Sequence, residues 1–150
     1  MTEWTRDEYD DWEADLARKQ RQDDAQLDAL TQTLTIRIPA TAWWTANSRL
    51  HHMEKARRTR TVRALAAHLA RRLLPMPAAD VHVLVHTPAA RRFDADNAAP
   101  MAKAVIDGIV DAAVLPDDDA KHRPRTTYEL GQPTRERGMY QLTITLKETR

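Results

Sequence analysis

Aspartates concentrate in two short segments in the second half of the chain. Asp94 and Asp96 lie two residues apart just before a predicted helix, and Asp117, Asp118 and Asp119 follow that helix. In an extended segment, a spacing of two puts both carboxylates on the same side. Clustered carboxylates repel one another unless a cation lies among them, and sites made of oxygen ligands suit Mg²⁺ or Mn²⁺. Because such ions hold phosphate oxygens and activate water, the pattern points to metal-assisted hydrolysis of phosphodiesters.

Basic side chains frame these aspartates. Arg91 and Arg92 precede Asp94, and Lys103 lies between the two acidic segments. Cations beside carboxylates suit a site that receives a metal ion and a phosphate backbone together, but they suit plain ion pairing equally well. Lys103 and Asp107 are four residues apart, so they also fit a pair on a helix surface worth about 0.3 kcal/mol. Three aspartates after a proline are likewise typical of a solvated turn, and both interpretations stay open at this point.

Residue types exclude several other kinds of site. An EF-hand loop beginning at Asp94 would need a ligand, a glycine and a glutamate where the chain has Ala98, Ala99 and Val105. Residues 90–93 are not the apolar strand that precedes the nucleophile of aspartyl-phosphate phosphatases. Cysteine is absent, and the 3 glycines form no phosphate-binding loop, so we expect no thiolate metal site and no nucleotide cofactor. Without a long apolar run or a signal peptide, we expect a cytoplasmic protein with no membrane partner.

The elements that must position these residues predict a small α/β (α+β) fold. Helices are predicted over residues 3–30, over 53–74 and from Asn97 to about Ala113, and strands over 34–38, 81–86, 125–130 and 140–146. Asn97 is a plausible N-cap, and Pro100 fits a first helical turn. The expected apolar face of the second helix is Val62, Leu65, Ala66, Leu69 and Leu73. We therefore expect helices packed on a small mixed sheet over residues 31–150, preceded by a helical arm at 1–30.

Charge is strongly partitioned although the whole chain carries only +1. Residues 1–30 carry −6, residues 31–80 carry +7, and residues 81–150 are neutral. The middle third therefore suits a polyanion such as nucleic acid, whereas the first thirty residues do not. The acidic arm is expected either to shield the basic part until DNA competes or to contact another protein.

The central segment resembles the RusA family of Holliday junction resolvases. Arg91-Arg-Phe-Asp94-Ala-Asp96-Asn97 is followed by Lys103-Ala-Val-Ile-Asp107-Gly108 and then by Val114-Leu-Pro-Asp117-Asp118-Asp119. This order matches the family pattern of Asp-x-Asp-Asn, a helix with Lys and Asp, and then paired Asp. The resemblance covers residues 33–148 and leaves the acidic arm outside.

The resemblance implies a Mg²⁺-dependent endonuclease, with Mn²⁺ as an alternative ion, that acts as a homodimer on branched DNA. Asp94 and Asp96 would be catalytic metal ligands, and the third ligand would come from the 117–119 run, with Asp118 favoured and Asp119 beside it. Lys103 would contact the scissile phosphate or the charge that develops there. Two nicks related by a twofold axis fit a C₂ dimer that presents two identical sites.

DNA-binding candidates are basic or amide side chains in and around these motifs. They are Arg49, Arg57, Arg58, Arg91, Arg92 and Asn97. Arginines on the helix at 53–74 fit phosphate binding and an ordinary solvated face about equally well. Two alternatives remain: a less selective nuclease for flaps or single strands on the same scaffold, and a junction-binding module without catalysis.

Overall fold

The computed structural model describes residues 3–27 and 30–149, and the chain divides into two units, Met1–Leu30 and Thr31–Arg150. The first unit holds one helix, α1 (Arg6–Leu27). A capping box begins it: the Thr5 hydroxyl accepts the Glu8 N–H at 3.3 Å, and the Glu8 carboxylate accepts the Thr5 N–H at 2.9 Å. No helix in the described part of the chain is both long and apolar enough to cross a membrane.

The second unit is built on a four-stranded mixed sheet. Its strands are β1 (Thr31–Pro39), β2 (Ala79–His86), β3 (Thr126–Leu130) and β4 (Met139–Glu148), in the spatial order β1-β4-β2-β3. β3 runs parallel to β2, whereas β4 is antiparallel to both of its neighbours. Leu34, Ile144 and Val83 lie side by side in this register and are fully buried. The period-two pattern therefore puts one apolar face against the core, which confirms the expected mixed α/β architecture.

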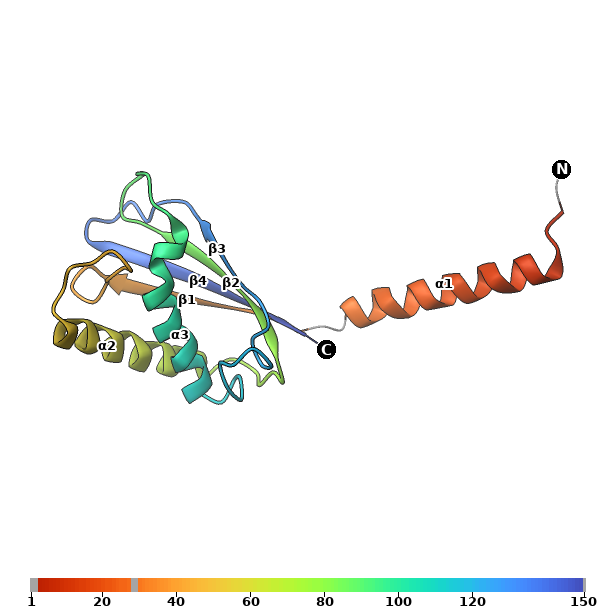
Figure 1. The fold of residues 1–150 in the computed structure, drawn as a ribbon, viewed down its shortest axis with the longest axis horizontal. Helices are drawn as coiled ribbons and strands as arrows, with labels where there is room; N and C mark the ends of the chain where they lie inside the picture. Colours follow the sequence, from red (N-terminus) through yellow and green to blue (C-terminus); the bar gives the residue numbers. More distant parts are fainter. Residues whose placement is uncertain (1–2, 28–29, 150) are drawn as a thin grey trace. The chain divides into compact units, whose positions relative to one another are not determined.

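Two helices cover that face, α2 (His52–Ala70) and α3 (Ala99–Asp111) (Figure 1). They contact each other closely at Gly108, because a Cβ added there would lie 2.6 Å from the carbonyl oxygen of Arg63. The buried residues of α2 are Val62, Ala66 and Ala70, which recur every four positions. Small side chains at this crossing let the two helix backbones approach each other.

Two helix predictions are corrected by the structure. α2 ends at Ala70 rather than Leu74, and Leu65 is 38% exposed, because the buried stripe runs through alanines instead of leucines. Asn97 is not an N-cap: it lies inside a short 3₁₀ helix, η1 (Ala95–Ala98), and the N-cap of α3 is Ala98. Pro100 does lie in the first turn of α3, as predicted.

The strand order decides which loops meet above the sheet. The chain leaves β2 at His86, passes through residues 87–94 and enters η1 and α3. The β3–β4 connection, residues 131–138, must pass over the same end of β2, because β2 lies between β3 and β4. Residues 87–94 and 131–138 are therefore neighbours at one end of the sheet.

Candidate active site

The Asp94–Asp96 pair occupies the junction between the loop after β2 and η1. Asp94 has extended backbone angles, φ −80 and ψ 114, whereas Asp96 lies within the 3₁₀ turn. The expectation of a continuous extended segment is therefore wrong, because the helical turn begins one residue after Asp94. Both aspartates are exposed, and neither carboxylate makes a hydrogen bond or an ion pair with another described residue. These oxygens are available to a ligand from outside the chain.

A shallow pocket of about 400 Å³ opens beside this pair. Its lining comes from two loops that are distant in sequence: Thr45, Asn47, Arg91, Arg92, Phe93, Asp94 and Asn97. A backbone hydrogen bond of 3.0 Å from the Ala46 N–H to the Asn97 carbonyl ties the two loops together. Guanidinium and amide groups, which can donate to phosphate, thus share one open surface with the Asp94 carboxylate.

Lys103 holds the second acidic segment against α3. Its Nζ donates to the Asp107 carboxylate at 2.6 Å and also to the carboxylate of Asp118. Partial burial disfavours the charged lysine, but the hydrogen bonds to the two carboxylates outweigh it, so the pKa of Lys103 is raised. The hydrogen bond from Lys103 lowers the pKa of Asp118. The alternative of a helix-surface pair between Lys103 and Asp107 is therefore confirmed, with Asp118 as a third member.

The three aspartates of the 117–119 run have three different partners. Asp117 accepts the backbone N–H of Asp118 at 2.7 Å, and Asp118 pairs with Lys103. Asp119 accepts the ring Nδ1 and the backbone N–H of His122 at 2.6 and 3.0 Å. Hydrogen bonds from His122 lower the pKa of Asp119. Asp118 is the member of the run that pairs with a residue of α3, and its role as a third ligand stays a prediction.

The carboxylates are suited to Mg²⁺ by donor type but are spread along α3. Within residues 3–27 and 30–149, no three Asp, Glu or His side chains gather as a metal centre. Asp96 lies in η1, before α3 begins, whereas Lys103 lies within α3 and Asp118 follows its end. Asp94 and Asp96 offer unpartnered oxygens, whereas Asp118 is already neutralised by Lys103. The donor atoms are of the kind that Mg²⁺ prefers, but the described residues do not bring three of them together, and Asp118 is held by Lys103.

Some of the arginines predicted to bind DNA form ion pairs within the protein, and others are exposed and unpaired among the described residues. Arg57 and Arg58 both pair with Glu54, whose pKa their hydrogen bonds lower to about 2. Arg58 also donates to the carbonyl of Trp43 at 2.7 Å, so it holds the 40–43 loop against α2. By contrast, Arg49 and Arg92 are exposed and make no hydrogen bond or ion pair with the described residues. The latter two are better placed to receive a phosphate group.

Arg91 lies over the Phe93 ring at 5.8 Å, and its guanidinium is 3.4 Å from the Tyr140 hydroxyl. Phe93 is half-buried. The stacked pair of Trp43 and Tyr140, with ring centroids 4.3 Å apart, supports this side of the loop from the core. Trp43 is a packing residue, since its side chain is buried.

Sequence reasoning missed two arginine roles. Arg63 is one of the arginines on the helix predicted at 53–74, for which phosphate binding and a solvated face fit equally well; it pairs with Asp111 at 2.6 Å and joins α2 to α3. The hydrogen bond from Arg63 lowers the pKa of Asp111. Arg135 and Arg137 lie beside the loop that leads to Asp94, although no motif marks them. The sequence signal for the Arg63 pairing was the presence of Asp107 and Asp111 on the facing helix. The position of Arg135 and Arg137 depends on the strand order of the sheet.

Comparisons with known proteins add no relative. No protein-family model matches the chain, and no curated protein matches it. The assignment of function therefore depends on the geometry above and on the resemblance of the motifs.

Proposed function

We propose that this chain is a Mg²⁺-dependent endodeoxyribonuclease that resolves four-way DNA junctions by paired symmetric nicks. The observation that supports this best is the pair of unpartnered carboxylates, Asp94 and Asp96, on the loop that carries the exposed Arg91 and Arg92. The arginines attract a phosphate backbone, and the carboxylates repel it unless a cation lies between them. A site for DNA binding alone has no use for those two acids.

Asp94, Asp96 and Asp118 are the residues that would hold the ion, with Asp119 next to the third. When bound, Mg²⁺ or Mn²⁺ would polarise a phosphoryl oxygen and lower the pKa of a water molecule, which could then attack phosphorus as hydroxide. Lys103 orients the Asp118 carboxylate through Nζ. A phosphate oxygen that approaches Asp118 would meet the positive charge of the Lys103 ammonium.

The proposed protein acts as a homodimer in the cytoplasm. A four-way junction has strands of like polarity related by a twofold axis, and two nicks in these strands leave two intact duplexes. A C₂ dimer presents two copies of one site in that symmetry. Each protomer would therefore make one nick.

A second candidate is a junction-binding module without catalysis. The observation in its favour is that Lys103 already neutralises Asp118, and that no three acids gather within the described residues. In this candidate Lys103 stands where a metal ion would lie beside Asp118, and the exposed Arg91 and Arg92 bind the phosphates. The two candidates differ in whether divalent ions produce nicks.

The deciding experiment incubates the purified protein with a synthetic four-way junction, a linear duplex and a single strand, each with and without Mg²⁺. We expect symmetric nicks only in the four-way junction, and only when Mg²⁺ is present. Asp94→Asn should abolish nicking while keeping or strengthening junction binding, because it removes a negative charge that faces phosphate.

Asp80→Asn is the matched control, because it makes the same isosteric change at the opposite end of β2 and should leave nicking intact. Binding without nicking by the unchanged protein would favour the binding module. Wild-type cleavage by the Asp94→Asn variant would refute the site. Cleavage of single strands or flaps without symmetric nicks would support the less selective nuclease.

A further inference from the structure

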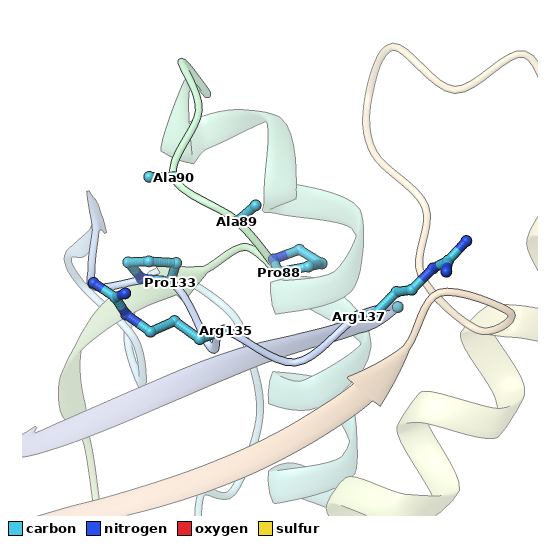
Figure 2. Close-up of a pocket in the computed structure, with 7 residues that line it drawn as sticks. Pro88, Ala89, Ala90, Pro133, Arg135 and Arg137 are labelled. Atoms are coloured by element: carbon cyan, nitrogen blue, oxygen red, sulfur yellow. The ribbon is translucent and has the colours of Figure 1, made fainter.

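A second pocket, of about 460 Å³, lies between the loop after β2 and the β3–β4 connection (Figure 2). Its lining combines prolines, alanines and a glycine with two arginines: Pro88, Ala89, Ala90, Pro133, Arg135, Arg137 and Gly138. The volume falls in the range of about 300–1,000 Å³ that is usual for small-molecule sites. We call it the proline pocket.

Backbone hydrogen bonds fix the two walls of the proline pocket to each other. The Thr134 N–H donates to the Thr87 carbonyl at 2.8 Å, and the Arg135 N–H donates to the Pro88 carbonyl at 3.0 Å. Arg135 has φ 58, in the left-handed region that residues other than glycine rarely adopt. These hydrogen bonds hold the two walls of the pocket together in the protein without a ligand.

The rim of the proline pocket is positively charged and unpaired. Arg135 and Arg137 are exposed, and neither side chain makes a hydrogen bond or an ion pair with another described residue. Glu136, which lies between them in sequence, is engaged by Arg37. Figure 2 shows the two guanidiniums at opposite sides of the apolar surface. A ligand that fits both features has a flat apolar part flanked by two anionic groups.

We propose that the proline pocket binds one unpaired nucleotide of a DNA strand, with the base on the prolines and alanines and the flanking phosphates on Arg135 and Arg137. This proposal rests on the proposed nuclease function, because a nucleotide there belongs to the strand being cut. Ala90 is four residues from Asp94 on the same loop, at most about 14 Å of extended chain. The pocket therefore selects DNA with an unpaired nucleotide near the cut, such as a four-way junction whose crossover has loosened.

Binding is measured in EDTA, so that cleavage plays no part, using a single-stranded oligonucleotide with one 2-aminopurine and a fully paired duplex of the same sequence. Fluorescence of 2-aminopurine rises when the base leaves its stacked neighbours. The proline pocket has no aromatic lining to quench it. We expect fluorescence to rise with the single strand and not with the duplex.

Two variants separate the charged rim from the apolar floor. In Arg135→Asn/Arg137→Ala, asparagine tolerates the left-handed backbone, and two phosphate contacts are lost. The slope of log affinity against log salt for single strands should become shallower by about 1.4. Ala90→Leu fills the pocket without changing charge, so affinity should fall about fivefold or more while the salt slope is unchanged.

Arg72→Ala is the matched control for charge, because Arg72 is exposed, unpaired among the described residues and near the end of β2 that is opposite the pocket. It should leave the fluorescence rise unchanged. If both pocket variants bind the single strand like the unchanged protein while junctions are still nicked in Mg²⁺, the proline pocket is refuted and the nuclease function stands. If the unchanged protein binds no DNA at all, both proposals fail. If the pocket prefers a proline-rich or aromatic peptide, 2-aminopurine fluorescence would not change on DNA addition, and this would also refute the proposal that the pocket binds a nucleotide.

Discussion

Replacing Gly108 with alanine tests the helix crossing on which the candidate site is built. α3 carries Lys103 and follows Asp96, so its position against α2 sets where those side chains lie. A Cβ at position 108 would lie 2.6 Å from the Arg63 carbonyl oxygen and 2.8 Å from the Ala67 nitrogen. Both are backbone atoms, so neither can rotate away, and the helices must separate.

The cost follows from these distances. Ordinary contacts between heavy atoms begin at about 3.5 Å, so the two helices must move apart by about 1 Å, which loses a quarter to a half of each dispersion contact across the crossing. Overpacking of this kind costs about 3 kcal/mol at the upper end of its usual range. This loss of folding free energy is offset by about 1 kcal/mol, because alanine has a higher helix propensity than glycine. We expect a net loss of about 2 kcal/mol, which lowers Tm by about 8 °C for a unit of this size.

Scanning calorimetry of the whole chain measures this change. Ala66 supplies the third close contact, at 2.7 Å from the added Cβ, and it is a side-chain atom. The pair Ala66→Gly/Gly108→Ala should therefore be less destabilised than the sum of the two single variants, with incomplete recovery because the backbone contacts remain. An unchanged or raised Tm for Gly108→Ala would show that the helices do not cross at this distance.

The remaining predictions concern charge. Lys103→Met should raise the pKa of Asp118 toward its ordinary value, since the hydrogen bond from Lys103 is what lowers it; a carboxyl NMR titration that shows no rise would contradict the pairing. Because the pKa of Glu54 is lowered in the folded state, its pairing stabilises the fold above about pH 4.5 and is lost on acidification toward pH 2. Glu54→Gln should flatten the acid limb of a stability-against-pH curve in that window, and an unchanged limb would refute the pairing. Deleting residues 1–30, which carry −6 of a total of +1, leaves a chain of +7; its affinity for DNA should rise most at low salt, and an unchanged affinity would rule out repulsion by the arm.

The elements that the sequence predicted best are those with a strict period. Leu34, Ile36 and Ile38 alternate with polar residues in the sequence, and all three are buried on one face of β1. Period two depends on the strand alone, so the pattern could be interpreted without knowledge of neighbouring strands. The apolar face predicted for α2 is confirmed at Val62 and Ala66 and wrong at Leu65, and the helix ends at Ala70 rather than Leu74.

The candidate chemistry was also readable from residue types, whereas its arrangement was not. The spacing of Lys103 and Asp107 predicted a helix-surface pair, and this pair exists. That Asp118 joins this pair depends on the path of the chain after α3, which no local pattern reveals. The extended geometry expected across Asp94 and Asp96 failed because packing of η1 against the sheet and α3 favours a turn there.

By itself, the sequence determined the strand faces, the acidic and basic segments and the absence of thiolate chemistry, because these depend on the order and type of residues. Tertiary structure alone decided which arginines are engaged and which are exposed. Arg58 donates to loop carbonyls 15 and 18 residues away, and Arg63 pairs with Asp111 48 residues away. The proline pocket exists because the β3–β4 connection must cross the end of β2 in this strand order. Contacts between distant segments follow from the topology of the sheet, and local sequence patterns do not predict them.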